Sequence, residues 1–319
     1  MVHSRYSTFS EPDGLQEMLG LRSTVLVRTG RHFEADLLSI DTGRLWMKLS
    51  SAHTPLAVSA TMTDRRMPVL FLADHPRAPI RVNGIEVTGD QLILGPDDGT
   101  FHLLTQGDYR LASMSLSAED LASWSKAITG SEIGPAPSTQ VLRPPPALMA
   151  ELRAAHHAAC RHTRSTGLED PATTRALEQD LVQVVMRCIA QSLPAGLEPT
   201  GNPKVVARFR EFLESKRHEP VYVAEICRAI GVSEGTLRNC CREQLGMSPI
   251  RYLWLRRMHL ARSALLSAEA GAKVVTDIAT EYGFWELGRF SVQYRSLFGE
   301  SPSATLKRSR AAADQSKVH

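Results

Sequence analysis

The chain has 319 residues, of which 43% are hydrophobic and 22% are charged. These are ordinary values for a globular protein that is long enough for two domains and a connector. Its start lacks the apolar core of an export signal, and no apolar run approaches the roughly 18 residues that would span a bilayer. We therefore expect a cytoplasmic protein without a membrane partner.

The formal net charge of +3 conceals an uneven distribution of charge along the chain. Residues 1–203 contain 18 Lys and Arg against 22 Asp and Glu, whereas residues 204–310 contain 18 against 11. A basic C-terminal third is expected where the phosphates of a nucleic acid are neutralised. The acidic N-terminal part is a poor candidate for contact with DNA.

Residues 1–130 have the pattern of a β-rich domain. Short runs of alternating apolar residues, such as HFEADLLSI, PVLFLA and YRLASMSL, are separated by turn signals such as Asp-Thr-Gly. About eight strands at a spacing of roughly 8–12 residues predict a small antiparallel barrel or sandwich. Asn83-Gly84, between IRV and IEV, is the strongest hairpin signal in the chain.

The predicted barrel contains no recognisable catalytic or metal-binding pattern. His32, His53, His75 and His102 stand singly, and neither a nucleophile–base spacing nor a glycine-rich phosphate loop is present. We therefore expect no enzyme activity, catalytic residue, metal or cofactor. Each aromatic residue of the region is most simply a core residue. As a set inside a barrel, however, they predict a pocket for a small-molecule effector: Phe33, Trp46, Phe71, Phe101 and Tyr109.

Residues 131–193 are expected to form a connector and a helical region. The proline-rich segment Gly130–Pro146 predicts a semi-rigid connector, and helices are expected over Ala147–Thr166 and Pro171–Gln191. The second helix carries an apolar stripe that either docks on the barrel or pairs across a dimer; its members are Leu177, Leu181, Val184, Val185, Cys188 and Ile189. Residues 194–203, rich in Pro and Gly, predict an interdomain linker.

The C-terminal region contains two segments of similar sequence. The segments Val223–Pro249 and Val275–Pro302 match at an offset of 52 residues up to the glycines Gly231 and Gly283, and then at an offset of 53. Apolar positions and the closing Ser-Pro coincide in both copies. Two copies are too few for a repeat array, which usually needs at least about three. A helical hairpin with solvated charges is the simpler alternative to a pair of DNA-reading units.

Each copy has the signals of a helix-turn-helix. In the first, a short amphipathic helix ends at Gly231, and Ser233 is a natural N-cap for the helix that follows. Leu237, Cys241 and Leu245 mark the buried face of that second helix. Because the five cysteines of the chain contain no CxxC pair, we expect reduced and mostly packed thiols.

The opposite face of each second helix carries the candidate DNA-binding residues. Arginine and asparagine side chains pair with guanine and adenine edges or with phosphate. The first copy presents Glu234, Gly235, Thr236, Arg238, Asn239 and Arg242. The second presents Gly288, Arg289, Ser291, Val292 and Arg295, which is a less polar set. We expect more base hydrogen bonds from the first copy and more shape and methyl contacts from the second.

Residues 204–308 resemble the DNA-binding domain of the AraC/XylS family of bacterial transcription regulators. The resemblance is carried by GVSEGTLRNCCREQLGMSP, by IRYLWLRRMHLARSALL and by the run from Gly283-Phe284 through Phe290, Tyr294, Phe298-Gly299 and Ser301-Pro302. It implies seven helices in two subdomains that are bridged by a linker helix over Tyr252–Leu266. The recognition helices would be Glu234–Gln244 and Leu287–Phe298. Gly235 and Gly288 depart from the family, where many relatives carry a large polar or aromatic residue.

The resemblance also implies an α+β organisation and a function. Residues 204–310 would be the double helix-turn-helix domain, residues 311–319 a disordered tail, and residues 1–130 a cupin-like sensor. The linker-helix residues Arg256, Arg257 and Arg262 would touch the DNA backbone or form a solvated face. The chain would be a sequence-specific, effector-responsive activator with double-stranded DNA, a small molecule, RNA polymerase and a second copy of itself as partners. The alternative is an effector-independent regulator whose N-terminal domain only dimerises or binds a protein.

Overall fold

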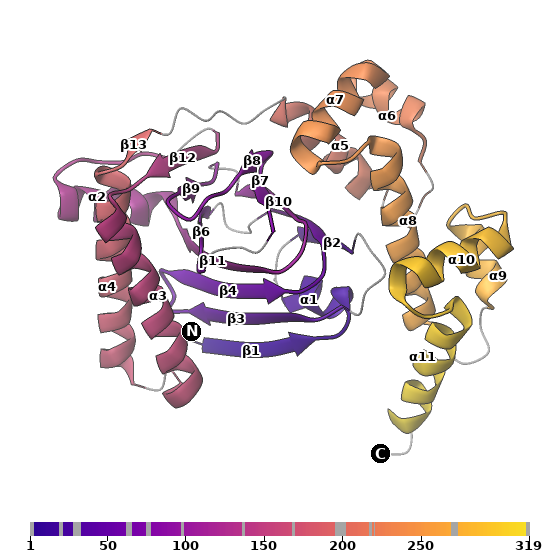
Figure 1. The fold of residues 1–319 in the computed structure, drawn as a ribbon, viewed down its shortest axis with the longest axis horizontal. Helices are drawn as coiled ribbons and strands as arrows, with labels where there is room; N and C mark the ends of the chain where they lie inside the picture. Colours follow the sequence, from indigo (N-terminus) through magenta and orange to yellow (C-terminus); the bar gives the residue numbers. More distant parts are fainter. Residues whose placement is uncertain are drawn as a thin grey trace. The chain divides into compact units, whose positions relative to one another are not determined.

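The computed structural model describes residues 3–316 apart from 19–21, 28–32, 62–65, 75–77, 97–98, 136–137, 168–169, 195–201, 217–218, 220 and 269–273. The chain forms two compact units (Figure 1). The first consists of Met1–Val25 and Glu34–Pro199, and the second of Leu26–Phe33 and Thr200–His319. None of the described helices has both the length and the apolar character required to cross a membrane.

The strands form two sheets, and the strand pairs of the described residues are antiparallel, as predicted. They lie in two separate sheets rather than in one closed barrel. In its spatial order the larger sheet consists of β1 (His3–Phe9), β3 (Ala35–Asp41), β4 (Trp46–Ala52), β11 (Tyr109–Leu116), β6 (Met67–Leu72), β9 (Leu92–Leu94), β12 (Gln140–Arg143) and β13 (Leu193–Pro194). The smaller consists of β2 (Arg22–Val27), β5 (Leu56–Thr61), β10 (Thr100–Thr105), β7 (Ile80–Val82) and β8 (Ile85–Glu86).

The turn at Asn83-Gly84 confirms the predicted hairpin. Asn83 has φ 49° and Gly84 has φ 81°, so both central residues adopt the left-handed conformation of a two-residue turn. Val82 and Ile85 then face each other across β7 and β8. The Asn83 side chain ties this turn to its surroundings, since its Nδ2 donates to Thr139 Oγ1 at 2.7 Å.

Side-chain alternation gives the larger sheet two different faces. On β4, Met47 is buried in a cluster with helical residues, while its neighbours Trp46 and Lys48 line a cavity on the other face. On β11, Ala112 belongs to the same buried cluster, and Leu111 lines the cavity. Because successive strand residues point to opposite sides, the two faces follow from the parity of the residue number.

Three helices pack on the first of these faces: α2 (Ala118–Thr129), α3 (Pro146–Thr166) and α4 (Pro171–Ala190). In Figure 1 they lie together at the side of the larger sheet. The predicted stripe on α4 is buried there with sheet residues, Leu181, Val184, Val185, Cys188 and Ile189 being 9% exposed or less. The stripe therefore docks on the strands of its own chain and is not left open for a dimer.

Some elements differ from the expectation. The short helix α1 (Pro12–Met18) and the helix α2 were not predicted, although Ser117 caps α2 by accepting from Asp120 N. The supposed connector Gly130–Pro146 contains strand β12, whose Val141 pairs with Ile93 of β9. Proline composition suggested a linker there, but the intervening run QVLR is long enough to add a strand between β9 and β13.

The second unit contains the seven expected helices among the described residues: α5 (Pro203–Ser215), α6 (Val223–Ile230), α7 (Glu234–Leu245), α8 (Pro249–Leu266), α9 (Val275–Glu281), α10 (Leu287–Phe298) and α11 (Pro302–Ser316). Within this unit α8 runs from the group α5–α7 to the group α9–α11 (Figure 1). It begins earlier than Tyr252 because Ser248 caps it. Helix α11 continues past residue 310, where a disordered tail was expected. Most of the predicted linker 194–203 lies outside the described residues.

The short segment Leu26–Phe33 groups with the helical unit although it lies far upstream in the sequence. The backbone N–H of Val27 donates to Nε2 of His259 on α8 at 3.0 Å. Burial lowers the pKa of His259 to about 4, so its imidazole is neutral at physiological pH and can accept this hydrogen bond.

Candidate nucleic-acid interface and ligand cavity

The first helix-turn-helix consists of α6 and α7. Gly231 ends α6 with φ 68°, in the left-handed conformation that the sequence predicted. Ser233 Oγ then accepts from Thr236 N at 3.0 Å and caps α7. Ile226 of α6 and Leu237 of α7 are fully buried, so the two helices are held together by apolar contact.

The second helix-turn-helix, α9 and α10, has an aromatic core. The ring centroids of Phe284 and Phe290 lie 4.9 Å apart, those of Phe290 and Tyr294 5.5 Å, and those of Tyr294 and Phe298 4.6 Å. The Tyr294 hydroxyl is 3.0 Å from Thr305 Oγ1 on α11, which satisfies its buried polar group. Three of these rings follow one another along α10 itself, and Phe284, in the turn before it, packs against the first of them.

The structure places every predicted DNA-binding residue on an exposed face. On α7 these are Glu234, Gly235, Thr236, Arg238, Asn239 and Arg242. On α10 they are Gly288, Arg289, Ser291, Val292 and Arg295. The residues between them that face inward, such as Cys240 and Tyr294, are buried. Each recognition helix thus presents one continuous exposed surface.

The face of α10 contains an aromatic residue that the sequence analysis missed. Trp285, directly before this helix, is 75% exposed, and Val292 on the helix is 71% exposed. The available signal was a Trp in the turn of the second copy, where the first copy has no aromatic residue. A Cβ added to Gly288 would meet no atom within 4 Å, so this face is open at its centre.

The arginines of α8 have different roles. Arg256 and Arg262 are buried: Arg256 donates to Leu213 O at 2.7 Å, and Arg262 pairs with Glu300 at 3.0 Å. These two side chains hold helices together and do not form a surface for DNA. Arg257 is partly exposed and lines a hollow beside Trp285 and Arg289. Of the three, Arg257 alone stays available for phosphate.

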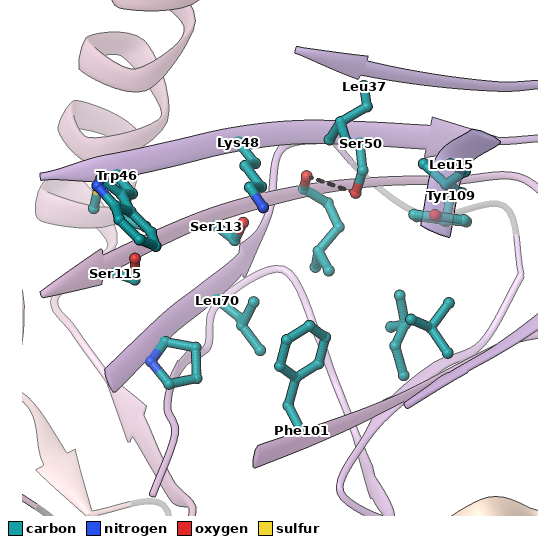
Figure 2. A pocket seen from close by; sticks show the side chains of 15 residues that line it. Leu15, Leu37, Trp46, Lys48, Ser50, Leu70, Phe101, Tyr109, Ser113 and Ser115 are labelled. Atoms are coloured by element: carbon teal, nitrogen blue, oxygen red, sulfur yellow. Dashed lines mark hydrogen bonds between the residues drawn. The ribbon is translucent and has the colours of Figure 1, made fainter. Parts of the chain in front are cut away.

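A narrow cavity lies in the first unit, with residues of both sheets in its lining (Figure 2). The volume of the cavity is about 50 Å³. Three of the five predicted aromatic residues line it: Trp46, Phe101 and Tyr109. The rest of the lining is mostly aliphatic, with contributions from Leu15, Leu37, Val58, Leu70, Leu103 and Leu111.

The other two predicted aromatic residues lie elsewhere. Phe71 is on the helix-covered face of β6, where its ring meets His156 edge-on with centroids 5.4 Å apart. Phe33 groups with the helical unit. Burial lowers the pKa of His156 to about 4, so this histidine is a neutral core residue.

The cavity contains a lysine that the sequence analysis missed. Figure 2 shows the amino group of Lys48 pointing from β4 into the space near Ser113. Burial lowers the pKa of Lys48 to about 8, because desolvation penalises its charged form. Burial also raises the pKa of Tyr109 to about 12, so the phenol stays neutral. The available signal was a lysine at a cavity-facing position of an apolar strand.

Comparisons with known proteins agree with the geometry of the second unit. Residues 226–308 match the model of a helix-turn-helix domain family. The chain is 38% identical over 105 residues to the "Probable thc operon regulatory protein" of Rhodococcus erythropolis, covering 33% of this chain and 32% of that one. It is 31% identical over 106 residues to "XylDLEGF operon transcriptional activator 2" of Pseudomonas putida, covering 33% of this chain and 67% of that one.

The chain belongs to the AraC/XylS family. Its helical unit is therefore the DNA-binding part of a transcription regulator, and the family is one of regulators and not of enzymes. The structure of the AraC-like transcriptional activator CuxR aligns over 88% of this chain and 100% of that one, with 14% identity and a TM-score of 0.41. The match to the Rhodococcus relative spans about a third of that protein's length.

Two of the four histidines that stand singly in the predicted barrel have partners in the structure. His102 Nδ1 is 3.0 Å from Ser59 Oγ, and His53 lies 3.4 Å from Asp108 at the surface. His32 and His75 lie outside the described residues. Within the described ranges, no group of three or more His, Cys, Asp or Glu residues could hold a metal ion. The five cysteines are free and buried.

Proposed function

We propose that this regulator is a sequence-specific activator that places α7 and α10 in successive major-groove segments. The observation that carries the proposal is the pair of exposed recognition faces on one scaffold. On α7, Arg238 and Asn239 would donate to base edges, and Arg242 would meet phosphate. On α10, Val292 and Trp285 would contact thymine methyl groups and sugars, with Arg289 and Arg295 on the backbone.

The first unit would regulate the activity of the DNA-binding unit. It encloses a cavity with apolar walls and a few polar groups, which is the composition of a small-molecule site. A ligand that binds one state of the regulator better than another would shift the balance between them. Activation would also require contact with RNA polymerase, and a second copy of the chain would duplicate the operator boxes.

Footprinting of the full chain on its operator tests the DNA arrangement. If α7 and α10 occupy the same face of the duplex, one copy protects two boxes about 10 base pairs apart, or roughly 34–36 Å. A dimer protects two such pairs. One continuous short box from a single copy would mean that α10 does not enter the groove.

The same footprinting experiment, repeated with and without ligand, tests whether a ligand in the first unit regulates DNA binding. A ligand that occupies the cavity and changes the protection or its affinity supports the sensor. A regulator that binds its operator identically under every ligand is the effector-independent alternative, in which the first unit only dimerises or binds a protein.

A further inference from the structure

The exposed faces of α7 and α10 carry the same residue at two positions. At the offset of 53 residues between the two copies, Gly235 corresponds to Gly288. At the same offset, Arg242 corresponds to Arg295. The other exposed residues of α7 have different counterparts on α10: Glu234, Thr236, Arg238, Asn239 and Glu243 correspond to Leu287, Arg289, Ser291, Val292 and Ser296.

The fold does not require glycine at either of the shared glycine positions. Neither residue has a positive φ, and a Cβ added to Gly288 would meet no atom within 4 Å. A Cβ added to Gly235 would meet Ser233 Oγ at an ordinary contact distance of 3.7 Å. Glycine makes a helix less stable than alanine does, because it loses more conformational freedom on folding. Both recognition helices therefore carry a residue that weakens them and that their described neighbours do not explain.

The two shared arginines lie in the last turn of their helices and are exposed. Among the described residues, neither Arg242 nor Arg295 has a side-chain hydrogen bond or an ion pair. Both guanidinium groups are therefore available to a partner outside the chain. Since a guanidinium group suits the geometry of a phosphate, the charge and shape of these side chains match a nucleic-acid backbone.

The glycine and the arginine of each helix lie on the same side of it, at opposite ends. They are seven residues apart, which corresponds to about two turns and roughly 10 Å along the helix axis. The major groove is about 12 Å wide. A helix that crosses the groove can therefore bring its glycine to one sugar–phosphate backbone and its arginine to the other. The residues between them, such as Asn239 on α7 and Val292 on α10, then lie over the bases.

We propose that each recognition helix is seated on DNA by a docking pair, a glycine and an arginine that contact the sugar–phosphate backbone whatever the base sequence. The docking pairs are Gly235 with Arg242 on α7 and Gly288 with Arg295 on α10. This inference rests on the proposed placement of both helices in the major groove, and it separates the residues that seat a helix from those that read bases. The backbone has the same chemistry at every site, so two units that read different boxes can share their contacts to it. At each glycine, a sugar approaches the helix so closely that a Cβ would collide with it.

The glycines are tested by substitutions that should stabilise the fold and weaken DNA binding. Gly235→Ala and Gly288→Ala restrict the unfolded chain, so each should raise the thermal midpoint of the full chain by roughly 1–4 °C. Each should nevertheless lower the affinity for DNA about fivefold or more, because the added methyl group displaces the helix from the backbone. Gly235→Gln and Gly288→Gln add a larger side chain and should lower the affinity further.

The DNA probe is a duplex that the unaltered full chain selects from random sequence. Because the docking pairs contact the backbone, the alanine variants should bind this duplex more weakly and still select the same bases. Ala304→Gly, at an exposed position in the first turn of α11, is the matched control. It makes the reverse exchange in the same unit, so it should lower the thermal midpoint by a similar amount and leave the affinity unchanged.

The arginines are tested by the salt dependence of binding to the same duplex. Arg242→Gln and Arg295→Gln each remove one phosphate contact, so each should reduce the slope of log affinity against log salt concentration by about one. The selected bases should stay the same in both variants. Arg175→Gln, on the exposed surface of α4, removes a positive charge elsewhere and should change neither the slope nor the selected bases.

The outcomes separate this inference from the proposed function. Full affinity, a lower thermal midpoint or changed base preferences in the glycine-to-alanine variants would overturn the role of the glycines. An unchanged salt slope in Arg242→Gln and Arg295→Gln would overturn the role of the arginines. With two protected boxes in the footprint, either result leaves the proposed function standing. A single box from one copy of the unaltered chain contradicts the proposed function at α10, while weaker binding by Gly235→Ala still supports the docking pair of α7.

Discussion

In the first helix-turn-helix unit, the recognition helix α7 starts from a serine cap and presents Arg238 and Asn239, while aliphatic and cysteine side chains pack beneath it. In the second, α10 starts without a side-chain cap, presents Val292 and follows the exposed Trp285, while aromatic rings pack beneath it. The two units thus share the spacing of their helices and differ in nearly every contact.

This difference shows that the motif is specified by which positions are buried and by where the chain turns. Leu237 and Phe290 occupy equivalent places and are both fully buried, although one is aliphatic and the other aromatic. The exposed faces carry no such constraint, so each is free to suit a different stretch of DNA. Three sets of variants test how independent the units are.

The largest effect is expected from emptying the core of one unit. Phe290→Ala should lower the free energy of unfolding by about 3–5 kcal/mol, and Leu237→Ala by about 2–5 kcal/mol. If the units fold separately, Phe290→Ala removes protection of one DNA box and keeps the other. Denaturant unfolding and footprinting measure both, with the exposed Val292→Ala as the stability control. Simultaneous loss of both boxes would show that the units fold as one.

A smaller effect is expected from the DNA faces. Arg238→Ala or Asn239→Ala should cost about 1–3 kcal/mol of specific binding and relax the preference at particular bases of the first box. Val292→Ala should reduce the free energy of specific binding by less and should act only on the second box, because it removes a methyl contact and not a hydrogen bond. Site selection with the full chain measures these changes. Arg175→Ala, on the exposed surface of α4, is the matched control. Unchanged specificity in Arg238→Ala and Asn239→Ala would contradict the assignment.

The smallest effect is expected from the helix starts. Ser233→Ala removes the hydrogen bond to Thr236 N and should destabilise α7 by about 1 kcal/mol. Glu286→Ala, at the corresponding start of α10, removes no such bond and should be nearly neutral. Thermal unfolding compares the two variants. An equal loss in both would mean that Glu286 stabilises α10 through its charge near the helix N-terminus.

The helical unit was predicted well from sequence because its signals are local. Glycines end helices, serines begin them, and apolar spacing marks the buried face of the first copy. The start of α7 at Glu234 and both ends of α10 were implied by the resemblance to the family, and the structure has them there. The roles of Arg256 and Arg262 could not be found in this way. Their partners, Leu213 and Glu300, lie on other helices, and only the folded chain brings them together.

The first unit was predicted less well because its features depend on pairing between distant segments. Along each strand, alternate residues point to opposite faces of the sheet. This alternation tells which aromatic residues line the cavity (Trp46, Phe101 and Tyr109) and which is on the helix-covered face (Phe71), but only once it is known which face of each strand the helices cover. Strand β12 depends on its pairing with β9. Helix α2 is different, because its local signals, the N-cap Ser117 and the C-cap Gly130, were present in the sequence and were missed. The position of Lys48 in the cavity could be recognised only from the fold, because the residues around it come from several strands.

The hydrogen bond from Val27 to His259 means that residues 200–319 do not contain all the contacts of the helical unit, so they cannot simply be transferred to another protein. A gene fusion that joins residues 200–319 to another sensor would leave His259 facing a foreign segment, or none. A recombinant made in this way should carry residues 26–33 along, or replace His259 by a residue that needs no donor.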